Sequence, residues 1–140
     1  MILNFANSKH EILNSKQITM IQISNNKQYD LEERTLKFAH NVRYFVAKLP
    51  KTRGNIEDGT QLIRSSGSIG ANYIEANESL SKKDFVMRVK ICKKEAKESC
   101  YWLELLDITT TIELQKEKLF LLKEATELMK IFGSIIERSK

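Results

Sequence analysis

Proline, glycine, cysteine and histidine are all scarce in this sequence. One proline, Pro50, and five glycines among 140 residues argue against a loop-rich or all-β fold, whose turns need many more of both. No stretch approaches about 18 consecutive apolar residues, and no basic region precedes an apolar core at the start of the chain. We therefore expect neither a transmembrane helix nor a signal peptide, and no contact with a membrane.

The few metal-binding and redox-active residues are poorly placed for chemistry. Cys92 and Cys100 lie eight positions apart in a helical pattern, roughly 12 Å along the axis, which is too far for a mutual disulfide. Free thiols in a reducing cytoplasm are the expectation. His10 and His40 are near neither a cysteine nor a carboxylate pair at ligand spacing, so we expect no metal site and no cofactor.

The composition fits one compact domain with an extension. Hydrophobic residues make up 41% of the chain, charged residues 29%, and the formal net charge of +5 permits an acidic partner. Residues 1–28 are rich in Asn, Ser, Lys and Ile and lack a sustained helical period, although Ile18–Ile23 has β-type composition. We predict an N-terminal extension over 1–28, disordered or containing a short strand, and a helical domain over 29–140.

Four capped helical segments are expected in that domain. Three N-terminal capping boxes are predicted, pairing Asp30 with Glu33, Ser81 with Asp84, and Thr110 with Glu113. The second segment follows Gly54-Asn55, and a loop over 107–111 separates the third segment from the fourth.

Each segment carries an apolar seam at alternating spacings of four and three residues. The seam residues are Leu31, Thr35, Phe38, Val42, Phe45 and Leu49; Leu62, Ser66, Ile69, Tyr73, Ala76 and Leu80; Phe85, Val89, Cys92, Ala96, Ser99, Leu103 and Leu106; and Leu121, Ala125, Leu128, Phe132 and Ile135. Four such segments with short connections predict an all-α fold, an antiparallel up-down-up-down four-helix bundle. One long coiled-coil hairpin, the alternative, would not need four capped segments.

Small residues fill the middle of the second segment. Gly67 and Gly70 together cost roughly 2 kcal/mol of helix propensity relative to alanine. Close approach of another backbone would compensate for that cost.

The third segment carries a one-sided basic face. Lys83, Lys90, Lys94 and Lys97 fall within about 60° of one another on the side opposite the apolar seam, with Lys93 beside them. Such a face is usually just solvated, and the alternative is a contact for a polyanion, which the basic net charge favours.

A second apolar strip lies between the seam and the lysines. It consists of Met87, Ile91, Trp102 and Leu105. A helix with two apolar strips is either buried all round or contacts another subunit. We identify these four residues as a candidate oligomer interface, with Trp102 as a bulky residue at the edge of the bundle as the alternative.

Enzymatic chemistry has little support. Gly67–Gly70 is not a phosphate-binding loop, because no strand precedes it and no Lys-Ser/Thr pair follows it. The neighbouring serines lack a nearby base. Glu75 and Glu78 are more typical of ion pairing, with Arg64, Arg88 or the lysines of the third segment, than of acid–base catalysis. We expect no catalytic residues, and we expect that the protein is not an enzyme.

The helical domain resembles the bacterial four-helix-bundle proteins known as the 23S rRNA intervening-sequence protein family. The resemblance covers residues 29 to about 138 and is carried, in order, by Tyr29–Thr35, Arg64–Ala76, Lys83–Phe85, Glu95–Ser99 and Tyr101–Leu103. It departs from the family at Gly70, where many members have proline, and at Ala76, where many have glycine.

The resemblance implies up-down bundles that assemble into homopentamers with a basic surface and have no established enzymatic activity. A relative, the accessory protein of diversity-generating retroelements, binds nucleic acid and a reverse transcriptase. Our leading hypothesis is therefore a homo-oligomer that binds nucleic acid, RNA in preference to DNA, through a repeated basic surface. The alternative is a protein-interaction scaffold or accessory subunit, with a partner such as a reverse transcriptase and no direct contact with nucleic acid.

Overall fold

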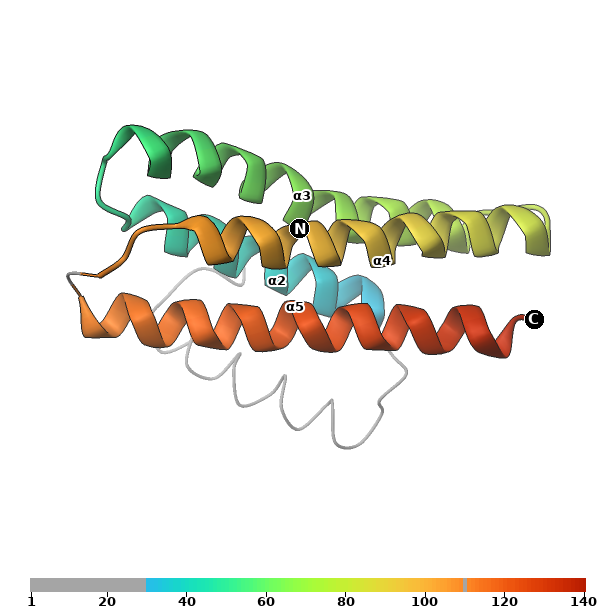
Figure 1. Ribbon diagram of the computed structural model, residues 1–140. Coiled ribbons are helices and arrows are strands. Elements are labelled where there is room, and N and C mark those ends of the chain that lie inside the picture. Colours follow the sequence, from blue (N-terminus) through green and yellow to red (C-terminus); the bar gives the residue numbers. More distant parts are fainter. Residues whose placement is uncertain (1–29, 110) are drawn as a thin grey trace. The chain divides into compact units, whose positions relative to one another are not determined.

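Four helices form a four-helix bundle, as predicted. The structure, a computed structural model, describes residues 30–109 and 111–140. The helices are α2 (Leu31–Ala47), α3 (Arg53–Asn77), α4 (Lys82–Leu105) and α5 (Ile112–Arg138) (Figure 1). The predicted extension and its β-type run over 18–23 lie outside the described residues.

Side-chain caps set where two of the helices begin. Ser81 accepts a hydrogen bond from Asp84 N at 3.1 Å, which confirms the predicted cap of α4. At α3 the cap is Thr52, whose hydroxyl accepts from Asn55 N, so this helix begins ahead of the predicted Gly54-Asn55 boundary. The N-cap of α5 is Thr111, without a side-chain hydrogen bond, whereas the predicted Thr110 lies outside the described residues.

The core consists largely of the predicted seams. Phe38, Val42 and Phe45 of α2 are buried, as are Leu62 and Ile69 of α3, Val89, Cys92, Ala96 and Leu103 of α4, and Leu121, Ala125, Leu128 and Phe132 of α5. Leu31, Tyr73, Phe85 and Ile135 of the predicted seams are only half-buried, and Leu80 was wrongly placed in a seam, because its side chain is 99% exposed. Helix α3 ends at Asn77, so Leu80 lies in the turn before α4 and no longer follows the helical period.

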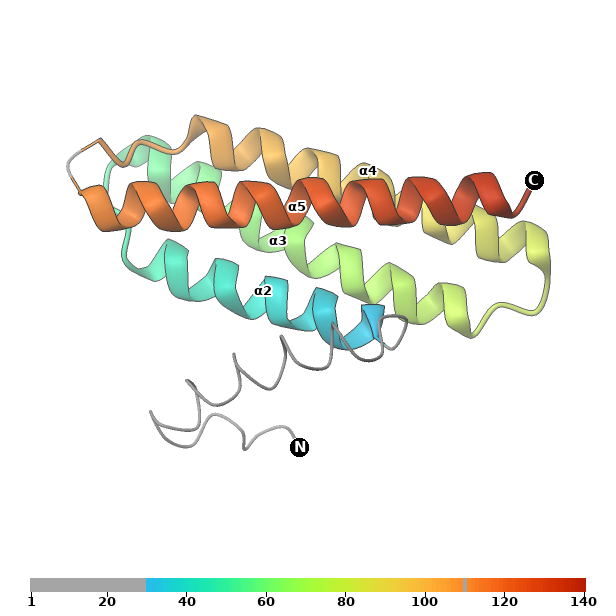
Figure 2. The same cartoon turned by 90° about the horizontal axis from the view of Figure 1, so that it is seen from below.

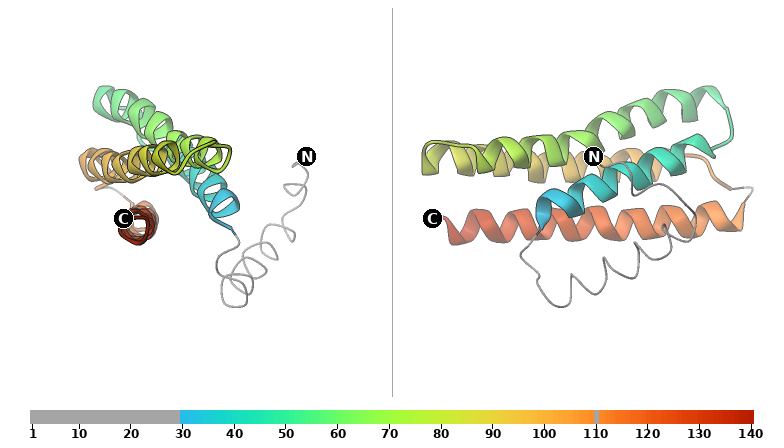
Figure 3. Two further views of the ribbon diagram at one scale, coloured as in Figure 1. Left: turned by 90° about the vertical axis from the view of Figure 1, so that its right-hand side faces the viewer. Right: turned by 180° about the vertical axis from the view of Figure 1, so that it is seen from behind.

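Helices α3 and α4 run antiparallel, because residues further along α3 contact residues nearer the start of α4. From α3 to α4, Ser65 pairs with Ser99 at 2.8 Å, and Asn72 accepts from Arg88 at 3.0 Å. From α4 to α5, Cys100 lies 3.8 Å from Thr126. Figure 2 shows the four helices side by side, and the end-on view in Figure 3 places α4 between α3 and α5, against both of which it packs.

A buried asparagine joins two connections at one end of the bundle. The Asn55 amide group donates to Pro50 O at 3.0 Å and to Asp107 O at 2.9 Å, while its Oδ1 accepts from Asp107 N at 2.9 Å. The α2–α3 turn is thereby fixed to the segment that follows α4.

No helix in the described part of the chain combines the length and apolar character needed to cross a membrane.

Candidate nucleic-acid interface

The five candidate lysines are all exposed on α4. This helix contacts α3 through Arg88, Cys92 and Ser99, whose partners are Asn72, Ile69 and Ser65. Lys83, Lys90, Lys93, Lys94 and Lys97 occupy the remaining outer surface of the helix. At a rise of 1.5 Å per residue, Lys83, Lys90 and Lys97 form a row about 21 Å long.

Some cations of the described residues form ion pairs with carboxylates, whereas others, such as Lys116 and Lys123, do not. Arg34 binds Glu124 through two hydrogen bonds of 2.7 and 2.9 Å, and Lys48 contacts Glu117 at 2.6 Å. In the part of the chain that the structure describes, none of the five α4 lysines is paired with a carboxylate. Their charge is therefore not neutralised by an internal partner and is available to an external anion.

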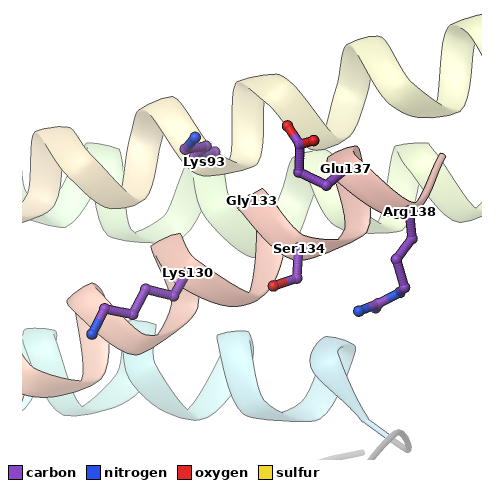
Figure 4. Close-up of a pocket in the computed structure, with 6 residues that line it drawn as sticks. All are labelled: Lys93, Lys130, Gly133, Ser134, Glu137 and Arg138. Carbon is purple, nitrogen blue, oxygen red and sulfur yellow. The ribbon is translucent and has the colours of Figure 1, made fainter. Parts of the chain in front are cut away.

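Lys93 is set apart from the other four lysines by its contact with α5. Its Nζ and Cε lie 3.6 and 3.7 Å from the position a Cβ atom would occupy at Gly133. It lines a shallow, open groove of about 510 Å³ together with Lys130, Gly133, Ser134, Glu137 and Arg138 (Figure 4). The sequence reasoning missed the α5 residues, although Lys130, Ser134 and Arg138 follow one another at intervals of four, a spacing that places them along one side of a helix.

The candidate oligomer strip is only partly exposed. Met87 and Leu105 are 53% and 48% exposed, whereas Ile91 and Trp102 are half-buried. The sequence reasoning missed Tyr101, which is 59% exposed and meets the Trp102 ring edge-on at a centroid distance of 5.1 Å. The structure thus leaves an apolar surface on α4 beside the lysines, with Met87 and Leu105 at its two ends.

Arg64 forms ion pairs with α4. Its guanidinium binds Glu98 Oε1 and lies 3.7 Å from Glu95 Oε1, so the suggested pairing of Arg64 with Glu75 or Glu78 was wrong. Glu95 is only 9% exposed, and burial raises the pKa of its carboxyl despite the opposing effect of Arg64. The other named candidate, Arg88, donates to Asn72. The sequence could not choose among these partners, because the choice depends on the relative register of α3 and α4.

The two cysteines and the serines of the core, Ser65 and Ser99, are engaged in structural contacts. Both cysteines are free, and the buried Cys92 thiol donates to Ile69 O at 3.4 Å. Burial raises the pKa of Cys92 to about 12, so its reactive thiolate is scarce at neutral pH. The Ser65 and Ser99 hydroxyls form a hydrogen bond with each other in the core.

Within residues 30–109 and 111–140, no cluster of three or more His, Cys, Asp or Glu side chains could hold a metal ion.

Comparison with known proteins assigns the fold to a family. Residues 27–134 match the model of the 23S rRNA-intervening sequence protein family. The chain belongs to this family. A crystal structure at 1.70 Å resolution, of a protein with unknown function from the S23 ribosomal protein family of Bacteroides thetaiotaomicron VPI-5482, is 34% identical, with a TM-score of 0.66. That match covers 76% of this chain and 98% of the other, and no curated protein matches.

Family membership accounts for the bundle without assigning an activity. The crystallised neighbour is itself described as a protein of unknown function. The family's name connects it with sequences that interrupt 23S rRNA genes, which is a genomic location and does not specify a reaction. What this member does must therefore be argued from its own surface.

Proposed function

We propose that this chain is a non-enzymatic, self-associating helical bundle that binds nucleic acid, RNA in preference to DNA, through the basic face of α4. The observation that carries the proposal is the group of five exposed lysines without carboxylate partners, Lys83, Lys90, Lys93, Lys94 and Lys97. Phosphate groups would supply the counter-charge that the bundle itself does not.

Self-association would strengthen this interaction. Each added copy contributes a formal charge of +5 and repeats the lysine row, so one nucleic-acid molecule can contact several rows at once. The apolar residues Met87 and Leu105 support self-association, because both lie exposed on the same helix as the lysines. A contact made through them would place the lysines of neighbouring copies close together.

The contacts are expected to recognise the backbone in preference to the bases. The row of Lys83, Lys90 and Lys97 is about 21 Å long, which corresponds to roughly six phosphates along one strand of a duplex at about 3.4 Å each. Lysine ammonium groups bind phosphates as point charges, without the planar geometry that reads base edges. We therefore expect affinity with little sequence preference.

The test is a titration of purified, nuclease-treated protein with a structured RNA and a duplex DNA at several salt concentrations. The variant Lys90→Glu/Lys94→Glu/Lys97→Glu should lose most of the affinity, and the slope of log K against log salt should fall by about 2 for single-stranded RNA. The control variant Lys51→Glu/Lys116→Glu/Lys123→Glu changes the net charge equally at exposed lysines off α4. Equal losses in the two variants would contradict the assignment to α4.

A protein-interaction scaffold is the second candidate, favoured by the exposed Met87, Tyr101 and Leu105 next to the lysines. An acidic protein with apolar side chains would suit such a mixed surface. Pull-downs from treated and untreated lysate separate the two functions, because partners bridged by RNA disappear after nuclease treatment. Partners that persist, together with no RNA binding at low salt, would favour the scaffold.

A further inference from the structure

The groove between α4 and α5 crosses α5 at two small residues. Gly133 has no side chain and Ser134 has a short one, so the backbone of α5 is thinly covered at this point. Lys93 reaches across from α4 to lie over Gly133, while Lys130, Ser134 and Arg138 follow one another along α5 (Figure 4). In Figure 4 the Lys130, Ser134 and Arg138 side chains point away from α4, so a strand that crosses α5 here would meet Lys93 on one side and these residues on the other.

The charge around the groove is strongly positive. Lys93, Lys130 and Arg138 contribute three positive charges, and Glu137 contributes the single negative one. The Glu137 carboxylate is already paired with Lys140 at 3.0 Å. The three cations, in contrast, form no ion pair with a carboxylate of residues 30–109 or 111–140.

Helix stabilisation accounts for only one of these cations. Arg138 lies in the last turn of α5, where a positive charge interacts favourably with the helix dipole. That effect fades within one turn, whereas Lys130 lies two turns earlier and Lys93 belongs to a different helix. The helix dipole therefore does not account for Lys93 and Lys130.

We propose that this groove binds a phosphate of the nucleic-acid backbone, so that a strand held on the α4 lysines continues across α5 at Gly133 and Ser134. The inference rests on the proposed function, and Lys93 belongs to both surfaces. The Lys93 ammonium and the Lys130 and Arg138 side chains supply the positive charge, and the exposed Ser134 hydroxyl supplies a hydrogen-bond donor. The nucleic-acid footprint thus covers two helices.

The experiment compares two double variants on the same helix. Lys130→Glu/Arg138→Glu removes the α5 side of the groove, and Lys116→Glu/Lys123→Glu changes the charge equally at exposed lysines nearer the start of α5. The groove variant should bind single-stranded RNA on the order of tenfold more weakly, with a salt slope lower by about 1.4. Equal losses of RNA affinity in both double variants, or no loss in the groove variant, would contradict phosphate binding in the groove.

Two further measurements distinguish a loss of binding from a folding defect. Lys130→Gln/Arg138→Gln removes the charges without reversing them and should show the same direction of effect at an unchanged melting temperature. In ¹⁵N-labelled wild-type protein, the amide signals of Gly133 and Ser134 should shift when a short single-stranded RNA is added. Unshifted signals, in protein that binds RNA, overturn the proposal.

The outcomes separate this inference from the proposed function. If the α4 triple variant loses RNA binding while the groove double does not, the groove fails and the function stands. If wild-type protein binds no RNA, both fail. A titration with pyrophosphate covers the remaining source of phosphate: shifts at Gly133 and Ser134 with pyrophosphate but none with RNA would overturn a nucleic-acid ligand for the groove.

Discussion

Gly70 of α3 lies directly against Thr35 of α2. A Cβ atom at Gly70 would be 2.8 Å from Thr35 Oγ1, closer than real contacts allow, and 3.2 Å from Thr35 Cβ, a tight contact. Thr35 is fully buried and its Oγ1 donates to Glu32 O, so it has little freedom to move. We expected another backbone to approach these glycines closely, but at Gly70 the close neighbour is the Thr35 side chain, with the Thr35 backbone carbon at 3.8 Å, and Gly67 faces the flexible end of Arg43 at 3.4 Å.

Gly70→Ala should destabilise the bundle by about 1–3 kcal/mol, because the overlap with Thr35 outweighs the better helix propensity of alanine. Chemical denaturation measures the change. Gly54→Ala is the matched control, since nothing lies within 4 Å of its Cβ position, and it should be neutral or slightly stabilising. Adding Thr35→Ser, which keeps the hydroxyl, should not rescue the stability, whereas Thr35→Ala should recover part of it. No recovery with Thr35→Ala would place the strain elsewhere.

Asn55→Ala should cost about 2–3 kcal/mol, because it removes three hydrogen bonds of a buried side chain and leaves partly buried backbone groups of Pro50 and Asp107 without their partner. Urea denaturation tests this expectation. The control, Asn77→Ala, removes an exposed side chain with one hydrogen bond to Glu32 and should change stability little. Equal effects at the two sites would show that Asn55 does not fix the two connections together.

Glu95→Gln should raise stability at pH 7 and have progressively less effect as the pH falls to about 4. Burial raises the pKa of Glu95 in the folded state, so folding favours the protonated form. The contribution of the Glu95 carboxyl to the free energy of unfolding is therefore greatest at low pH and falls as the pH rises through its folded-state pKa. Melting temperatures of both proteins across this range measure the difference. A Glu95→Gln variant that is less stable at pH 7 would mean that attraction to Arg64 outweighs desolvation.

Cys100 should react with a thiol reagent before Cys92. The Cys92 thiol is fully buried, and with a pKa of about 12 only about one molecule in ten thousand carries the thiolate at pH 8. Cys100 is half-buried beside Thr126, and burial raises its pKa as well, so it should react more slowly than a free thiol. Mass spectrometry of alkylated peptides gives the order, with Cys100→Ser isolating Cys92. Faster labelling of Cys92 would show that α4 opens locally at that turn.

Met87→Glu/Leu105→Glu should convert a discrete assembly into a folded monomer. Both side chains are about half exposed, so charging them disturbs a contact between copies and spares the core. Light scattering after size exclusion measures the mass, and circular dichroism confirms the helix content. Ile112→Glu/Leu119→Glu changes exposed apolar residues of α5 and should leave the assembly intact. A monomeric wild-type protein would refute self-association and leave Trp102 as a residue at the bundle edge.

The apolar seams could be predicted because each helix must bury one side. Phe38, Val42 and Phe45 repeat at the helical period and are buried as that period requires, and Ser81 caps α4 as its sequence indicates. Helix ends were less certain, since Thr52 competes with Gly54-Asn55 as a start, and Leu80 continues the period beyond the end of α3. The spacing of apolar residues alone does not show where a helix ends.

The lysines of α4 could be predicted from the sequence, whereas the groove that α4 forms with α5 could not. Exposure of Lys83, Lys90, Lys94 and Lys97 follows from their position opposite the seam of α4. The groove with Lys130, Ser134 and Arg138 could not be predicted, because those residues are more than 30 positions away from Lys93 in the sequence. Only the packing of α5 on α4 brings Gly133 beneath Lys93.

The sequence by itself determined the four helices, the buried side of each one and the basic side of α4, because these depend on a spacing of residues within single segments. The tertiary structure decided the partners: Glu98 for Arg64, Asp107 for Asn55, Thr35 for Gly70 and Gly133 for Lys93. Each of these pairs depends on the relative register of two helices or connections. That register is set by the fit of many side chains together and is not encoded in the period of any one helix.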